Sequence, residues 1–377
     1  MEKCKLGDIC EIVSGSTPKT TIEEYWDGDV KWITPAELNE NVYIINDSVR
    51  KITKLAVEKT GLSSFPEGTV ILSTRAPIGK VAIAGCEMYC NQGFKNLICS
   101  EKIFNKYLYW FLKGNTMFLN SLGRGATFKE ISKAIVSEIE INVPEIEEQH
   151  EIVKILEKVN TIIRFRKQEL SVLDTLVKAR FVEMFGDAVD NPMGWEKKQL
   201  QEIVTDDCTI SYGIVQTGND QEEGVPVFRP VDIVNRIPKL EELKRTTEEI
   251  SNKYKRTILK GHEMLITVRA NIADTCIVGK EFKGCNVGRG IVPIRTQENI
   301  MVLEFLKYLM DSKHLNDDIK SKAKGITLIQ LNMEDLREVE LIVPPIEQQK
   351  AFVEFAEQVD KSKVKVQKAL DETQKLF

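Results

Sequence analysis

The sequence contains few histidines and no closely paired cysteines. Its three histidines, His150, His262 and His314, lie far apart, and the closest two of its eight cysteines are Cys86 and Cys90. Structural zinc sites use closely spaced Cys and His ligands, so we expect no metal site. The N-terminus also lacks an apolar stretch of signal-peptide length, and we therefore expect reduced thiols in a cytoplasmic protein.

Motifs for membrane insertion, nucleotide binding and catalysis are also missing. No run approaches the roughly 18 apolar residues of a membrane span. No Gly-x4-Gly-Lys-Ser/Thr loop is present, and Gly-x-Gly at 123–125 and 288–290 lacks a third glycine. Val-Pro-Pro-Ile at 343–346 faintly matches the Asn/Asp-Pro-Pro-aromatic signature of amino-methyltransferases, but it lacks the polar first and aromatic last residues, and we interpret it as a helix start. We predict no catalytic residues and no bound cofactor, although a site assembled from distant residues stays open.

Length and charge set broader limits. A chain of 377 residues is expected to form two or three domains. The net charge of −5 argues against a free-standing nucleic-acid binder, which usually has a basic surplus. A local basic face would still allow phosphate contacts.

Residues 144–185 are predicted to form one long helix. Pro144 and the acidic residues after it are typical of a helix start, and Gly186 is a natural stop. Polar Arg166 and Glu169 interrupt its apolar stripe, and we interpret them as a solvated edge. The helix-pairing residues expected on this stripe are Ile152, Ile155, Val159, Ile162, Leu173 and Leu176.

The same pattern returns 200 residues later, at 344–377. Here the expected helix-pairing residues are Phe352, Phe355, Val359 and Val366. Because a helix with a narrow apolar stripe needs a partner, we predict that the two helices pair antiparallel within one chain. A helix of about forty residues is about 60 Å long.

The segments between the helices repeat as well. Residues 225–233 overlay 30–38 at an offset of 195, residues 265–272 overlay 71–78 at 194, and residues 286–289 loosely overlay 91–95 at 195. Such a long repeat predicts two similar domains, at 1–143 and 186–343. The expected fold is α/β (α+β): two pseudo-repeated mixed domains separated by an intramolecular coiled coil.

Two similar domains held at a fixed separation suit duplex DNA, whose groove faces recur regularly. Arg, Asn and Gln can contact base edges, whereas Lys mostly positions phosphates. Arg75 and Arg269 occupy matching positions, so a structural role is an equal alternative for them. Thr34 and Arg229 differ at matching positions and are candidates for reading different half-sites. The candidate DNA-binding residues are Lys31, Thr34, Asn39, Arg75, Lys80, Gln92, Lys95, Arg124, Lys129, Tyr212, Gln216, Arg229, Asn235, Arg269, Asn271, Arg289, Lys322 and Lys324.

The whole chain resembles the specificity subunit of type I restriction–modification systems. The likeness is carried by Ile-Leu-Ser-Thr-Arg-Ala-Pro-Ile-Gly at 71–79, by the helix starts at 143–149 and 343–349, and by residues 185–187, 191–195 and 210–216. The resemblance implies two target-recognition domains that each read half of a bipartite double-stranded DNA target.

It also implies that the helices set the spacer and dock two modification (methyltransferase) subunits, joined by a restriction subunit. S-adenosylmethionine, ATP and Mg²⁺ would then bind to those partners, and no membrane would be involved. A coiled-coil scaffold and the recognition module of another DNA-modifying system are the alternatives.

Overall fold

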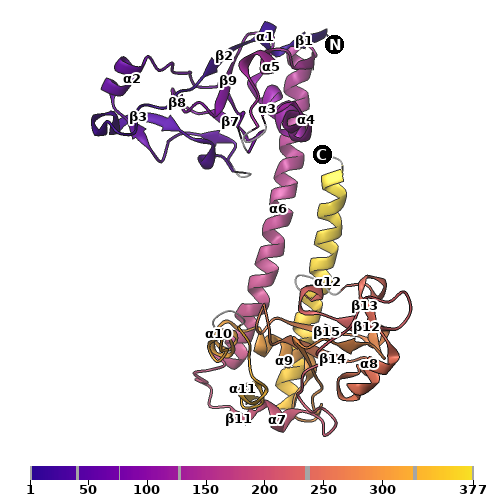
Figure 1. Ribbon diagram of the computed structural model, residues 1–377. Coiled ribbons are helices and arrows are strands. Elements are labelled where there is room, and N and C mark those ends of the chain that lie inside the picture. Colours follow the sequence, from indigo (N-terminus) through magenta and orange to yellow (C-terminus); the bar gives the residue numbers. More distant parts are fainter. Residues whose placement is uncertain are drawn as a thin grey trace. The chain divides into compact units, whose positions relative to one another are not determined.

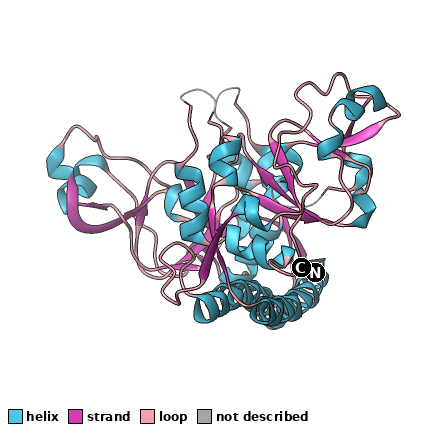
Figure 2. Cartoon of the chain, turned by 90° about the horizontal axis from the view of Figure 1, so that it is seen from below, coloured by secondary structure: helices cyan, strands magenta, loops and turns pink. Residues whose placement is uncertain are grey.

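The computed structural model describes residues 2–39, 42–75, 77–125, 129–233, 238–325 and 329–375. The chain forms two compact units (Figure 1). Unit 1 comprises Met1–Arg164 and Thr373–Phe377, and unit 2 comprises Phe165–Glu372, so the boundary falls inside the first long helix. Strands and short helices are interspersed in both units (Figure 2), which confirms the predicted mixed α/β class.

Unit 1 builds its sheets from short strands that are not all neighbours in sequence. The sheet orders are β2-β9-β6-β7-β4, β5-β3-β8 and β1-β10. The strands are β1 (Glu2–Lys5), β2 (Cys10–Ser14), β3 (Trp26–Ile33), β4 (Ile44–Ile45), β5 (Lys51–Ile52), β6 (Val70–Ser73), β7 (Val81–Ala84), β8 (Tyr89–Cys90), β9 (Phe94–Cys99) and β10 (Glu140–Val143). The helices before the long one are α1 (Leu6–Ile9), α2 (Lys54–Thr60), α3 (Asn105–Gly114), α4 (Thr116–Leu122) and α5 (Lys133–Ser137).

Unit 2 repeats this plan with smaller sheets. The sheet orders are β15-β14-β17, β13-β12-β16 and β11-β18. The strands are β11 (Glu196–Gln199), β12 (Val225–Phe228), β13 (Lys244–Thr246), β14 (Glu263–Thr267), β15 (Thr275–Val278), β16 (Asn286–Val287), β17 (Ile291–Ile294) and β18 (Glu340–Val343). The short helices are α7 (Leu200–Ile203), α8 (Glu248–Lys253), α9 (Leu303–Met310), α10 (Lys313–Ser321) and α11 (Met333–Arg337).

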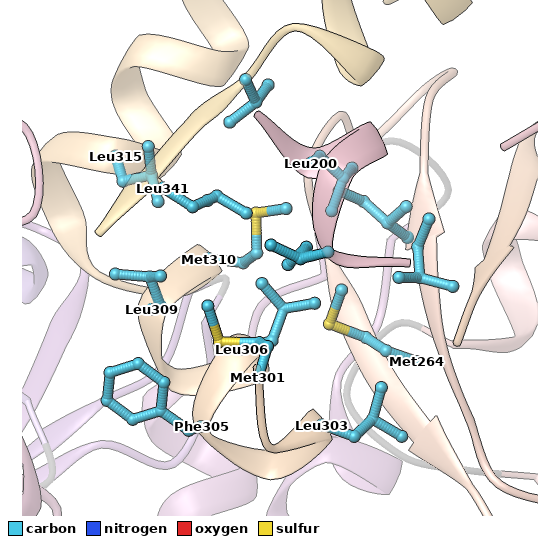
Figure 3. Packing of buried hydrophobic residues seen from close by; sticks show 14 of the residues in the cluster. Leu200, Met264, Met301, Leu303, Phe305, Leu306, Leu309, Met310, Leu315 and Leu341 are labelled. Atoms are coloured by element: carbon cyan, nitrogen blue, oxygen red, sulfur yellow. The ribbon is translucent and has the colours of Figure 1, made fainter. Parts of the chain in front are cut away.

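The central strands of both units, β6 and β14, are buried at every position and mostly apolar, because each of their faces covers a separate core. In β6, Val70 and Leu72 pack into one cluster and Ile71 into another. In β14, Met264 lies in the larger core of its unit, shown in Figure 3, and Leu265 lies in the smaller one. Successive side chains of a strand point to opposite faces, so a continuous apolar run can serve two cores.

The two long helices are α6 (Ile146–Phe185) and α12 (Ile346–Lys375). Glu147 and Glu148 lie in the first turn of α6, where their negative charges stabilise the helix because its N-terminus is the positive end of the helix dipole. The helix ends before Gly186, whose φ of 73° suits a glycine. The starts of both helices and the end of α6 lie within two residues of the predicted limits, and the predicted end of the second helix at 377 lies outside the described residues.

Within unit 2, the C-terminal half of α6 and α12 run antiparallel, as predicted. Asp174 pairs with Lys363 at 2.7 Å, and the Phe181 and Phe352 rings lie 5.4 Å apart edge to face, so numbers rise on one helix as they fall on the other. Arg166 donates a hydrogen bond to the backbone oxygen of Ala369. Arg166 is therefore a contact across the pair, which corrects its interpretation as a solvated edge.

The predicted stripe of α12 lies largely in the helix pair. Phe352 and Val359 are buried in the core of unit 2, and Phe355 packs against that core. Val366 is half-buried. The apolar periodicity of this helix therefore identified the correct face.

The predicted stripe of α6 is partly wrong. Ile155 is 60% exposed, and Ile162 and Leu176 are also exposed, whereas Ile152, Val159 and Leu173 are half-buried. The more deeply buried apolar residue is the one that follows a predicted residue: Val153 follows Ile152, Leu156 (buried in part) follows Ile155, Ile163 follows Ile162 and Val177 follows Leu176. Where two apolar residues are adjacent, a 3-4 spacing fits either of them, and only packing decides which one faces inward.

Candidate nucleic-acid interface

Corresponding turns in the two units start at a proline after the central strand of a small sheet. In unit 1, the Thr34 N–H donates to Glu37 Oε1 at 2.7 Å as the short helix η2 (Pro35–Glu37) begins. In unit 2, the Arg229 N–H donates to Asp232 Oδ2 at 2.8 Å at the start of η3 (Pro230–Asp232). The Arg229 guanidinium also bonds to both Asp232 oxygens, at 2.9 and 2.6 Å, and this hydrogen bonding raises the pKa of Arg229. The carboxylate of Glu37 in unit 1 and that of Asp232 in unit 2 therefore hold equivalent turns in place.

The second pair of turns joins β6 to β7 and β14 to β15, and carries Arg75 and Arg269. Arg75 Nε lies 2.9 Å from Glu130 Oε2, and Arg269 Nε lies 2.6 Å from Gln330 Oε1. The amide of Gln330 also donates to the Tyr212 hydroxyl. In both units the arginine therefore holds the segment that follows the loop containing Gly125 in unit 1 or Gly325 in unit 2, and these contacts favour the structural role for Arg75 and Arg269.

The third pair of turns precedes β9 and β17. The parallel register places Cys90 of β8 opposite Ile33, and Val287 of β16 opposite Phe228. Two residues later, Gln92 in unit 1 and Arg289 in unit 2 occupy the same place at an offset of 197. The loose overlay at 195 was wrong by two residues, because the connections before these strands differ in length.

The sheet register also matches Lys80 with Asp274. Ser73 donates its N–H to Lys80 O at 2.9 Å, and Thr267 donates its N–H to Asp274 O at 2.9 Å. By the same reasoning Glu130 corresponds to Gln330. Asp274, Glu130 and Gln330 were missed by sequence reasoning, although Glu130 and Gln330 are 200 residues apart, as are the nearby Gly125 and Gly325.

In unit 1 these turns surround a hollow of about 380 Å³, which brings together four predicted residues, Thr34, Arg75, Lys80 and Gln92. Lys80 Nζ donates to the backbone oxygen of Pro35 at 2.9 Å. We call these four residues the rim of unit 1. The corresponding rim of unit 2 consists of Arg229, Arg269, Asp274 and Arg289.

Two predicted lysines of unit 1 lie elsewhere. Lys95 is only 7% exposed, with its ammonium 3.7 Å from Glu130, and burial lowers its pKa. It lies on β9, where the neighbouring side chains are also buried, and this burial argues against a direct DNA contact by Lys95. Lys31 donates to Asn46 O at 2.7 Å and to Cys86 Sγ at 3.2 Å, which makes it a support for a neighbouring turn.

The remaining candidates of unit 1 are exposed side chains outside the rim. Asn39 and Lys129 are exposed, and each borders a stretch outside the described residues. Arg124 lines a separate hollow of about 580 Å³ together with Phe118 and Ile135.

In unit 2, Gln216 and Asn271 are exposed, and Tyr212 is half-buried beside Gln330. Lys322 pairs with Asp318 at 2.5 Å, and Lys324 lies 3.4 Å from Asp335. Asn235 lies outside the described residues. The geometry therefore leaves Arg289 as the exposed cation of the rim itself.

Within the described residues of both units, no group of three or more His, Cys, Asp and Glu side chains is placed to hold a metal ion. Over the same residues, no helix is long and apolar enough to span a bilayer.

Comparison with known proteins gives a consistent result. The sequence model of the type I restriction modification DNA specificity domain matches residues 1–175 and 192–373. The type I restriction enzyme MjaIX specificity subunit of Methanocaldococcus jannaschii is 32% identical over 371 residues, covering 90% of this chain and 82% of that protein. The EcoBI specificity subunit of Escherichia coli is 24% identical over 328 residues, covering 78% and 68%.

Two solved structures share the fold. The crystal structure of a type I restriction–modification S subunit from M. genitalium aligns with a TM-score of 0.56 at 15% identity, covering 100% of this chain and 93% of that chain. A chain from a structural study of complex assembly and conformational transition of the type I R-M system aligns with a TM-score of 0.63 at 20% identity, covering 99% and 93%.

Proposed function

Because the chain belongs to the type I restriction modification DNA specificity family, we propose that it is the DNA specificity subunit of such a complex. In this proposal each unit reads one half of a bipartite duplex target. The chain contributes recognition, and S-adenosylmethionine, ATP and Mg²⁺ bind to modification and restriction subunits. The sequence supports this division, since it contains no nucleotide-binding loop or catalytic motif.

The observation that carries the proposal is the duplicated rim. The backbone frame is the same in the two units, with the same strand pairings and the same turns. The side chains on that frame differ, with Gln92 in one unit and Arg289 in the other. Two copies of one frame with different side chains suit two half-sites of different sequence.

The exposed apolar face of α6 supports a docking role for this helix. Ile155 and Ile162, seven residues apart in unit 1, are exposed large apolar residues on it, and so are Val172 and Leu176, four residues apart in unit 2. A spacing of four or seven residues keeps the two side chains of each pair on one side of a helix. We propose that this face docks a modification subunit, whose apolar side chains would cover it.

A decisive experiment maps methylated adenines genome-wide in cells that carry the modification subunit, with and without the gene for this chain. The proposal requires a bipartite methylated motif that is present only with the gene. The proposal is contradicted if the genomes with and without the gene carry the same methylated motifs.

The helices are proposed to set the spacer between the half-sites. Inserting seven residues into both α6 and α12 lengthens each helix by about 10.5 Å, which equals about three base pairs of B-form DNA. We expect the spacer of the methylated motif to change while both half-sites stay the same. An unchanged spacer in a folded variant would refute this role.

A further inference from the structure

One exposed side chain occupies the same position of the third turn in each unit, Gln92 in unit 1 and Arg289 in unit 2. We propose that these are specificity-determining residues, with Gln92 selecting an adenine in one half-site and Arg289 a guanine in the other. The inference rests on the proposed function and goes further by naming the residues and the bases they select.

Both turns are held at their two ends by equivalent backbone hydrogen bonds. The residue before the exposed side chain donates its N–H to the end of a neighbouring strand, and the residue after it accepts an N–H from the residue that directly follows the central strand. In unit 1, the Asn91 N–H donates to Ile33 O at 3.1 Å, and the Thr74 N–H donates to Gly93 O at 2.8 Å. In unit 2, the Gly288 N–H donates to Phe228 O at 2.8 Å, and the Val268 N–H donates to Gly290 O at 2.9 Å. Anchoring on both sides fixes where the side chain begins, which base readout requires.

A second loop supports each turn from behind through a close backbone approach. Ser16 donates its N–H to Cys90 O at 3.0 Å, and Ile214 donates its N–H to Val287 O at 2.8 Å. The residue before each donor is a glycine, and a Cβ at Gly213 would overlap with Val287 O. Glycine is thus required for the approach in unit 2, and the equivalent Gly15 packs as tightly in unit 1.

The supporting loops differ in a way that matches the exposed side chains. In unit 1 the Thr17 hydroxyl donates to Gln92 Oε1 and thereby orients the amide. In unit 2 the corresponding residue is Val215, which has no hydroxyl, and Arg289 has no acceptor for one to bond.

The chemistry of the two side chains selects different bases. A glutamine amide can accept from adenine N6 and donate to N7, because its oxygen has a second lone pair beyond the one engaged by Thr17. An arginine guanidinium donates to guanine O6 and N7. The other arginines of the unit 2 rim are engaged internally, Arg229 with Asp232 and Arg269 with Gln330. Arg289 is therefore the rim arginine placed for a base edge.

The test uses the complex of the full chain with its modification subunits and a duplex DNA library with randomised half-sites. Gln92→Arg is expected to change one adenine to guanine in one half-site, and Arg289→Gln to change one guanine to adenine in the other. Preference for the original base should fall by roughly 5- to 150-fold in each case. Gln201→Arg adds the same charge on an exposed helix residue outside the rim, and should leave the selected motif unchanged.

Thr17 is a positioning residue in this scheme. Thr17→Val should weaken adenine selection at the Gln92 position without affecting the other half-site, and Thr17→Ser should restore it. Because Gln92 and Arg289 lie in different units, a folding defect in one variant leaves the other variant as an independent test. If the wild-type complex selects a bipartite motif that neither swap alters, the inference is overturned and the proposed function stands. If the wild-type complex selects no motif, the proposed function fails, and the inference with it.

Discussion

Replacing Gln149 with alanine is expected to destabilise unit 1 by about 3 kcal/mol, because this buried side chain makes three hydrogen bonds at the start of α6, two of them to the segment before α3. Gln149 is fully buried. Its Nε2 donates to Lys102 O and Pro144 O, both at 2.9 Å, and its Oε1 accepts from the Phe104 N–H at 2.7 Å. Each such bond contributes about 1 kcal/mol net, and a buried N–H left unpaired costs about 1–3 kcal/mol.

The repeat provides the same experiment in unit 2. Gln349 is also fully buried, and its amide bonds to Ile300 O at 3.0 Å, Pro344 O at 2.8 Å and the Val302 N–H at 2.9 Å. Gln349→Ala should therefore cost a similar free energy of unfolding in the other unit. The exposed neighbour Gln348 is a matched control, and Gln348→Ala should change stability by less than about 0.5 kcal/mol.

Chemical denaturation monitored by hydrogen exchange distinguishes the two units. Protection of the backbone amides should fall in unit 1 for Gln149→Ala and in unit 2 for Gln349→Ala. In a separate thermal unfolding experiment, the melting temperature of the affected unit should fall by roughly 6–12 °C. Losses below about 0.5 kcal/mol for both variants would refute the reasoning, since the glutamines would then behave as surface residues.

Two further pairs of variants test the corrections made by the structure. Val177→Ala should lower the free energy of unfolding of unit 2 by about 2 kcal/mol because Val177 is buried, whereas Leu176→Ala should cost less than about 0.5 kcal/mol. Equal losses in denaturant titrations would show that the buried face of α6 is assigned wrongly. Lys129→Ala should weaken binding of the complex to all DNA sequences and reduce the slope of log affinity against log salt by about 1. Lys95→Met should leave that slope unchanged, because the buried Lys95 faces Glu130, and a reduced slope would contradict this placement.

The candidate interface was partly visible in the sequence. The repeat brought Arg75 and Arg269 to matching positions, and the strand register confirms that match. Gln92 and Arg289 were both proposed as candidates, but the sequence overlay did not make them equivalents. Connection lengths shift the offset from 194 at the second turn to 197 at the third, and only the hydrogen-bonded register shows this shift.

Lys95 illustrates why a residue type alone was insufficient. In the sequence, Lys95 is followed by the polar residue Asn96, and such a pair is typical of a protein surface. In the folded unit it faces Glu130, which comes from a distant segment and is also paired with Arg75. A charge can be buried when such a partner is present, and the partner is a property of the tertiary structure.

The repeat, the mixed α/β class, the starts of both long helices and the family could be predicted from the sequence. These properties depend on local signals, such as proline and acidic residues at a helix start, and on a duplication that leaves residues at nearly constant offsets. Which of two adjacent apolar residues faces the core, as for Leu176 and Val177, and which polar residues share a surface became clear only in the folded chain. Those outcomes depend on contacts between segments far apart in the chain, because burial of any one side chain depends on what packs against it.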